Sequence, residues 1–239
     1  MKRAALLSLV LSLALSGSVA AAGKSPGASA EGTSLRPEFR STVFDFGHLG
    51  IDYTVYHRFP LVNPTPDTVR ILSVVAHCDC SSAICPDSLI LPGDSTTINL
   101  RYSTKNFYGP QNKSITVTTD HPAMKNIELF YLSIIGQWFN GLRPDPEALF
   151  FLQANQPKKI SIPNRNFDQI QLTNVSQIDH NFEIKVLTSK AKRNQAIELE
   201  IRPSGDIAKG TLHSNLTLQI DSSDGDPTIL TIPVKIVRY

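Results

Sequence analysis

The sequence predicts an all-β protein made of β-sandwiches in tandem, and three observations support this fold class. Apolar and polar residues alternate in short runs, for example 55–61, 98–102 and 115–119, which is the pattern of strands that are buried on one face. Clusters of Pro, Gly, Asn and Asp separate these runs, and turns at intervals of about 8–12 residues are typical of sandwiches. A helical period is almost absent from the chain.

Length and composition fit two globular domains and exclude several classes of protein. The 239 residues suffice for two domains of about 100 residues each. Hydrophobic residues make up 41%, charged residues 18%, and there are three Cys, which excludes a disordered chain, a collagen and a dense disulfide scaffold. Without Lys2 and Arg3 the 23 basic residues fall to 21 and balance the 21 acidic ones. A neutral chain implies no nucleic-acid or anionic-membrane partner.

Residues 1–22 have the features of a cleaved signal peptide. A basic start is followed by an apolar run over 4–15 and by small residues at Ala20 and Ala22, which predicts cleavage near Gly23. The apolar run is shorter than the ~20 residues that a spanning helix needs, so a retained anchor is the less favoured alternative. No cysteine for lipid attachment lies near the cut, and no later run reaches spanning length. We therefore expect a secreted or periplasmic protein with no membrane span in the mature chain.

The mature chain divides into a spacer and two halves with similar patterns. Residues 23–37 are rich in Gly, Ser and Ala and predict a flexible spacer. We expect one sandwich over 38–141 and a second over 142–239, with 143–146 as the linker. Gly109, an alternating run, a turn and an apolar strand recur as Gly210, a run, a turn and a strand. A spacing of about one hundred residues is what tandem sandwiches produce.

An ordered set of short motifs in the first half resembles a known family. The motifs are Phe44-Asp45-Phe46-Gly47, the run 55–63, the run 71–81 with Cys78-Asp79-Cys80-Ser81, Leu91-Pro92-Gly93, and Gly109 before Lys113-Ser114-Ile115. Together they resemble the bacterial exported family catalogued as a domain of unknown function, number fifteen seventy-three. That family is related to the Ig-like domains of hydin, abnormal-spindle and major-sperm-protein type. The resemblance covers roughly 39–137 and implies two Ig-like sandwiches, since the second half resembles the second Ig-like domain of such chains. It implies no activity, and Cys-Asp-Cys-Ser stands here where the family has Cys-Gly-Cys-Thr.

The cluster of His77, Cys78, Cys80 and Cys85 is the sharpest local feature. In an exported protein the favoured interpretation is a disulfide from Cys85 to Cys78 or Cys80. A Cys78–Cys80 bond is disfavoured, because residues two apart in an extended segment lie about 6.6–7 Å apart between Cα atoms. The thiol left over is either buried or pairs with another molecule.

Two further interpretations of this cluster remain open. All four side chains are ligand types for copper(I) or zinc, although the second ligand pair of a structural zinc site is missing. A thiol–disulfide exchange catalyst would need Cys-x-x-Cys at the start of a helix to lower a thiol pKa, and the sequence shows neither feature.

Other candidate residues have ordinary structural interpretations. Asp221, Asp224 and Asp226 resemble half of a calcium loop, but the final Glu is missing and a hairpin turn is favoured. His57 stands in an apolar alternation and is interpreted as a sandwich histidine. Trp138 and Phe139 follow the first half, where we expect Trp138 to pack between domains, with an exposed partner-binding anchor as the alternative.

The sequence favours a binding or structural protein over an enzyme. It contains no His-Glu-x-x-His and no phosphate-binding glycine loop, so no catalytic residue and no cofactor is predicted. The main hypothesis is an exported, non-catalytic Ig-like module of the cell envelope that recognises a protein partner. The alternative is a periplasmic copper-handling or thiol-redox protein that uses the cysteine cluster.

Overall fold

The computed structural model describes residues 36–152, 156–204, 208–223 and 225–239. The predicted signal peptide and nearly all of the predicted spacer therefore lie outside the described residues. Strands dominate the described part, which also holds two short 3-10 helices, η1 (Pro122–Met124) and η2 (Phe139–Gly141). The predicted all-β class is confirmed. Neither helix is long and apolar enough to cross a membrane.

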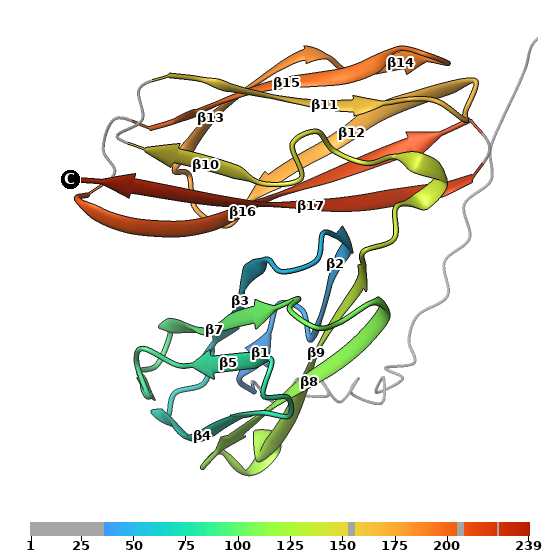
Figure 1. The fold of residues 1–239 in the computed structure, drawn as a ribbon. Coiled ribbons are helices and arrows are strands. Elements are labelled where there is room, and N and C mark those ends of the chain that lie inside the picture. Colours follow the sequence, from blue (N-terminus) through green and yellow to red (C-terminus); the bar gives the residue numbers. More distant parts are fainter. Residues whose placement is uncertain (1–35, 153–155, 205–207, 224) are drawn as a thin grey trace, which may run out of the picture. The chain divides into compact units, whose positions relative to one another are not determined.

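The first group of strands forms two facing sheets (Figure 1). One sheet has the order β1-β3-β7-β5, and the other has the order β2-β9-β8-β4-β6. The bounds of these strands are β1 (Glu38–Phe39), β2 (Val43–Leu49), β3 (Thr54–Val62), β4 (Val69–Ala76), β5 (Ser81–Ile84), β6 (Leu89–Ile90), β7 (Ser95–Ser103), β8 (Gly109–Thr119) and β9 (Asn126–Ile135).

The second group of strands repeats this arrangement. One sheet has the order β11-β15-β13. The other has the order β14-β12-β16-β17, with β10 also paired to β17, and it joins the β2-containing sheet of the first group through the parallel pairing of β17 with β2, so that the two form one ten-stranded sheet. The bounds are β10 (Leu149–Leu152), β11 (Lys158–Pro163), β12 (Gln169–Gln177), β13 (Phe182–Thr188), β14 (Lys190–Lys192), β15 (Ala196–Pro203), β16 (Gly210–Ser222) and β17 (Gly225–Arg238).

Strand order identifies both groups as Ig-like. In an Ig sandwich the first, second, fifth and fourth strands form one sheet, and the third, sixth and seventh form the other. The order β1-β3-β7-β5 against β9-β8-β4 matches this topology, and so does β11-β15-β13 against β17-β16-β12. In each group the last strand also pairs in parallel with a strand from the start of the group, β2 with β9 and β10 with β17. The two hairpins recognised as related in the sequence, β8–β9 and β16–β17, occupy the same place.

Each group encloses its own hydrophobic core, built from the inward residues of the alternating runs. The first core includes Phe46, Val55, Phe59, Leu100, Tyr102, Ile115, Leu129 and Tyr131. The second includes Leu142, Phe151, Ile160, Leu199, Leu216, Leu218, Ile232 and Val234. Residues 35–239 nevertheless form one compact unit, so the boundary between residues 141 and 142 stays a prediction.

A fully buried asparagine ends the second Ig strand of each sandwich. Asn63 follows β3 and Asn164 follows β11, and both side chains have no exposed surface. Asn63 Nδ2 donates to the Ile90 carbonyl at 2.9 Å, and Asn164 Nδ2 donates to the Ala191 carbonyl at 3.0 Å. Because buried polar groups need partners, each asparagine ties the end of its strand to a short strand of the facing sheet, Asn63 to β6 and Asn164 to β14. The equivalent positions give a second, independent sign of the internal repeat.

The two sandwiches contact each other where β2 meets β17. Gly47 has φ +64°, and a Cβ there would lie 2.1 Å from the Ile229 carbonyl oxygen. Thr231 Oγ1 donates to the Phe46 carbonyl at 2.6 Å beside this contact. Only glycine allows such a close approach in a left-handed conformation, so Gly47 of the Phe-Asp-Phe-Gly motif is needed for this junction.

Candidate functional site

The cysteine cluster lies at the turn where the chain crosses from one sheet of the first sandwich to the other. Strand β4 ends at Ala76, and β5 starts at Ser81. Between them Cys78 and Cys80 form a disulfide with their Cα atoms 5.1 Å apart. The Ser81 amide donates to the Cys78 carbonyl at 3.0 Å, which closes a tight turn. The disulfide therefore caps the start of β5.

This pairing differs from the favoured prediction that Cys85 would be bonded to Cys78 or Cys80. Cys85 is a free thiol, and its Sγ lies 3.1 Å from the Asp87 carbonyl oxygen. Strand β5 runs between Cys80 and Cys85 and holds them at opposite ends. The argument against a Cys78–Cys80 bond assumed an extended segment, but the chain turns there and brings the two Cα atoms within bonding range.

The structure does not assemble the predicted metal set of His77, Cys78, Cys80 and Cys85. His77 Nε2 is directed to Thr116 Oγ1 on β8, 2.5 Å away, and Cys85 stands at the far end of β5. Among the described residues no group of three or more His, Cys, Asp or Glu side chains is placed to hold a metal ion. The bonded sulfurs of Cys78 and Cys80 are also unavailable as thiolate ligands. The described residues therefore give no support for the copper-handling alternative.

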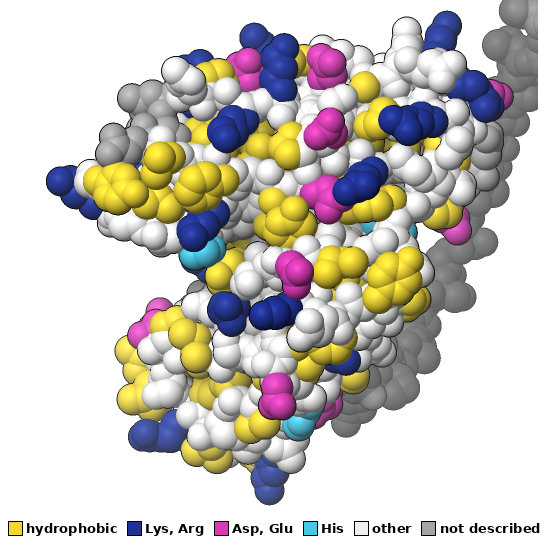
Figure 2. Space-filling view, viewed as in Figure 1, with side chains coloured by type: hydrophobic (Ala, Val, Ile, Leu, Met, Phe, Trp, Pro, Cys, Tyr) yellow, Lys and Arg dark blue, Asp and Glu magenta, His cyan; other side chains and the backbone are white. Residues whose placement is uncertain are grey.

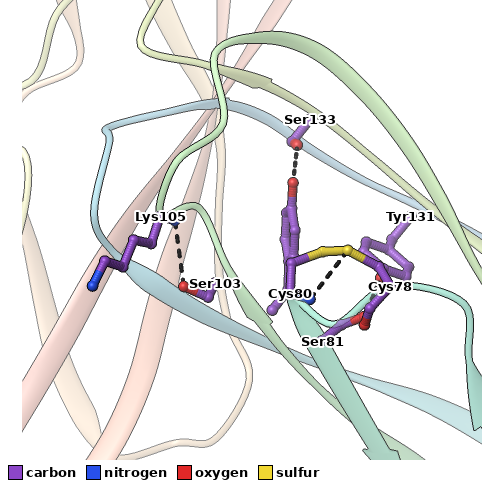
Figure 3. The surroundings of a disulfide bond; sticks show 8 residues. Cys78, Cys80, Ser81, Ser103, Lys105, Tyr131 and Ser133 are labelled. Carbon is purple, nitrogen blue, oxygen red and sulfur yellow. Dashed lines mark hydrogen bonds between the residues drawn. A yellow bond between two sulfur atoms is a disulfide. The ribbon is translucent and has the colours of Figure 1, made fainter.

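The buried Tyr131 supports the disulfide turn from inside the sandwich (Figure 3), and the buried Tyr102 packs against Tyr131. Tyr131 donates its hydroxyl to Ser81 Oγ at 2.6 Å, and the Tyr102 hydroxyl lies 3.2 Å from Ser133 Oγ. The two rings pack edge to face with centroids 5.1 Å apart. Burial raises the pKa of both phenols, so they stay neutral hydrogen-bonding groups. The first residue of β5 is thus fixed by the disulfide turn and by Tyr131.

A chain of polar groups on the outer face of β4, β8 and β9 resembles a catalytic triad, but its hydrogen bonds have the wrong direction. The Thr116 hydroxyl donates to Glu128 Oε1, and His77 Nε2 lies next to the same hydroxyl. Since the single hydroxyl proton goes to the carboxylate, His77 must donate to Thr116. A general base would instead accept the proton of the nucleophile. This surface network gives no support for an enzyme.

His57 is partly buried and packs on aromatic side chains of the first sandwich, which agrees with its interpretation as a sandwich histidine. Its ring stacks on Phe44 with centroids 3.6 Å apart and meets the Phe59 ring edge to face at 4.5 Å. Burial lowers the pKa of His57 to about 4. The imidazole is therefore neutral at pH 7 and serves as an aromatic packing group.

Strand β5 presents a free backbone edge. In the described part of the chain it pairs with β7 and with no other strand. The Ser103 amide donates to the Cys80 carbonyl at 2.8 Å, and hydrogen-bonded pairs alternate in an antiparallel ladder. Ser82 and Ile84 consequently face β7 with their backbone groups, whereas Ala83 directs its N–H and C=O to the open edge.

Exposed apolar side chains occur on β5 and on the segments before and after it in the sequence. Ile84 is 63% exposed, which is high for an aliphatic residue in a strand. Neighbouring strands and loops add the exposed residues Leu72, Val75, Leu89 and Leu91. Figure 2 shows apolar side chains gathered at the lower left, over the β4–β5 end of the first sandwich. Sequence reasoning missed this site, because Ser81-Ser82-Ala83-Ile84 has no strong strand pattern.

The remaining sequence candidates have structural surroundings. Trp138 is half-buried and packs against the second hydrophobic core. Phe139 is 37% exposed and stacks on Phe167 with centroids 6.0 Å apart, and a partner-binding role for either residue stays a prediction. Asp221 lies near the end of the β16–β17 hairpin, which favours the turn interpretation, and Asp224 lies outside the described residues.

Comparison with known proteins tests the family resemblance. The model of the family described as "Protein of unknown function (DUF1573)" matches residues 37–132. The resemblance found in the sequence is confirmed. No curated protein matches the chain.

Several solved structures align with the chain at low similarity. A protein of unknown function from Porphyromonas gingivalis W83 is 10% identical, with 83% of this chain and 98% of that one covered and a TM-score of 0.34. The YadV chaperone is 10% identical, with 82% and 98% covered and a TM-score of 0.34. The ASH/PapD-like domain of human CEP192 is 13% identical, with 53% and 99% covered and a TM-score of 0.35. Since these TM-scores lie below 0.5, they support no conclusion about fold or function.

Proposed function

We propose that this protein is an exported, non-catalytic Ig-like module of the cell envelope that binds an extended segment of a protein partner along the free edge of β5. The observation that carries the proposal is the unpaired edge of β5, where Ala83 directs its N–H and C=O outward beside the exposed side chain of Ile84. A partner strand would gain main-chain hydrogen bonds at such an edge and specificity from its alternate side chains.

The corresponding strand of the second sandwich shows how an edge is protected. Strand β13 carries Glu183 and Lys185, both exposed, opposite Arg202 and Glu200 of β15. Charged residues on an edge strand oppose pairing with another chain. Strand β5 has no charged residue. The two edges have the same place in the topology, so this difference favours β5 as the binding edge.

The rigid start of β5 also supports binding. The Cys78–Cys80 disulfide and the Tyr131–Ser81 hydrogen bond hold the strand before any partner arrives. Ordering a strand on association costs free energy, so an edge that is already ordered binds more tightly. Export follows from the predicted signal peptide over 1–22, and the oxidising compartment that it leads to would preserve the disulfide.

Site-specific photo-crosslinking in the exported protein tests this function. A photoreactive amino acid at position 84 should give light-dependent adducts, whereas the same group at Val186 on β13, which is 43% exposed, should give none. Ala83→Pro removes the outward N–H without touching the ladder to β7, and it should abolish the adduct at position 84. The proposal fails if position 84 gives no adduct, if position 186 gives the same one, or if Ala83→Pro in the folded protein leaves it unchanged.

A further inference from the structure

A cavity of about 700 Å³ lies beside the segment that joins the two sandwiches. Its size is in the range of small-molecule sites, about 300–1,000 Å³. Trp138 and Tyr53 contribute aromatic walls, and Arg165 and Asp145 contribute charged side chains. Neither the predicted protein-binding edge of β5 nor the disulfide turn is part of it. The cavity is therefore a separate candidate site.

The walls of the cavity are held in place by buried neighbours. Leu142 is 1% exposed and belongs to the second core, and Asn164, directly before Arg165, is fully buried. The backbone of Asp145 makes two hydrogen bonds with Ser161, at 2.8 and 2.9 Å. Asn166 Nδ2 donates to the Asn140 carbonyl at 2.6 Å. A site built on such fixed segments is preorganised for a ligand.

The polar groups in the cavity define what a ligand must offer. Arg143 and Glu147 pair with each other, so their charges are largely satisfied. Arg165 and Asp145 are exposed to solvent, and within the described residues their side chains make no ion pair or hydrogen bond with the protein. An unpaired guanidinium binds a carboxylate through two parallel hydrogen bonds, and an unpaired carboxylate accepts from hydroxyl or ammonium donors.

Proline residues exclude recognition of a peptide as an added strand. Pro144, Pro146 and Pro163 line the cavity, and proline has no N–H to donate. The backbone groups of Asp145 are already bonded to Ser161. An extended peptide therefore finds no free main-chain ladder here. The walls instead offer flat apolar surfaces. These suit a cyclic ligand that packs an apolar ring face against them and makes polar contacts through its substituents.

We propose that this cavity binds an acidic saccharide, with a pyranose face against Trp138 or Tyr53, the sugar carboxylate on Arg165 and ring hydroxyls on Asp145. Each unpartnered group then receives a complementary one. The apolar C–H face of a sugar covers the aromatic ring, and the hydroxyl edge reaches the polar groups. The inference does not depend on the β5 edge, so either proposal can fail alone.

The single tryptophan of the sequence makes the test direct, because Trp138 is the only source of indole fluorescence. The full exported chain is titrated with tetragalacturonate, with the uncharged maltotetraose and with the acidic peptide tetraglutamate. We expect a saturable change with tetragalacturonate and a Kd of about 0.1–1 mM. Binding of maltotetraose should be at least about tenfold weaker, since it lacks the carboxylates that meet Arg165. Calorimetry repeats each titration without relying on fluorescence.

Two arginine variants separate the site from general charge effects. Arg165→Gln should weaken tetragalacturonate binding at least about tenfold, whereas Arg202→Gln, an exposed arginine on β15 outside the cavity, should leave it within about twofold. The proposal is overturned if neither method detects tetragalacturonate, if Arg165→Gln binds like the wild type, or if tetraglutamate binds as tightly. Circular dichroism confirms that both variants are folded.

Discussion

Replacing Gly47 by alanine should damage the junction between the sandwiches far more than replacing an equally strained glycine elsewhere. Gly47 and Gly93 both have positive φ, +64° and +79°, so a side chain at either position costs about 1–2 kcal/mol of backbone strain. A Cβ at Gly93 meets nothing within 4 Å, whereas at Gly47 it meets the Ile229 backbone oxygen at 2.1 Å. Gly93→Ala is therefore the matched control for the close approach.

The two variants should differ in stability because a Cβ at position 47 forces backbone to move, whereas a Cβ at position 93 meets open space. Strand β2 can relieve the overlap only by shifting away from β17, which costs about 1–3 kcal/mol for overpacking. The hydrogen bond from Thr231 to the Phe46 carbonyl is strained or lost as well, at about 1 kcal/mol. Gly47→Ala should thus lose about 2–4 kcal/mol more of the free energy of unfolding than Gly93→Ala.

Urea unfolding followed by circular dichroism and by Trp138 fluorescence measures this difference. The free energies are comparable where the two signals change together. If the free energies of unfolding of Gly47→Ala and Gly93→Ala differ by less than about 0.5 kcal/mol, the close approach of β2 to β17 does not limit the residue at position 47. The reasoning from Gly47 is then refuted.

Three further outcomes can be measured on the same material. Asn63→Ala should cost more stability in urea than Asn164→Ala, because the Asn63 side chain makes five hydrogen bonds and the Asn164 side chain makes two; equal losses would contradict this. The pKa of His57 is about 4 in the folded protein and about 6.5 when unfolded, so the unfolded chain binds the extra proton. Wild-type stability should then fall as the pH drops from 6.5 towards 4, and His57→Gln should flatten this decline; parallel profiles would argue against it. Thiol titration of the non-reduced, unfolded chain should find one thiol, at Cys85, and Cys78→Ser should cost no more than about 2 kcal/mol, because the closed loop is so short.

Strand content was largely accessible from the sequence, because period-two alternation directly records which side chains face a core, whereas the Ig-like arrangement was implied by the family resemblance. The runs around Val55 and Ile98 became β3 and β7, which pair as the second and fifth strands of an Ig sandwich. Turn geometry was not accessible in this way. The Cys78–Cys80 bond depends on local backbone curvature, and the estimate for an extended chain wrongly disfavoured it, while the favoured bond to Cys85 does not form.

The buried asparagines and the β5 edge were missed for different reasons. Asn63 and Asn164 stand about one hundred residues apart after equivalent strands, a signal that comparison of the two halves could have detected. The β5 edge has no such signal. Whether an edge is open depends on which strands pair, and Ser82 and Ala83 reveal nothing about pairing until β7 is in place.

The two sandwiches differ most clearly at the strand that the proposed function uses for binding. Both retain the core alternation and the buried asparagine, which stabilise each half. They differ at the fourth Ig strand, where β13 is seven residues long and charged, and β5 is four residues long, uncharged and fixed at its start by a disulfide. A strand that only completed a sheet would gain stability from length and protection from charge. Strand β5 lacks the charges that protect β13, and under the proposed function its uncharged edge stays open to the addition of a partner strand.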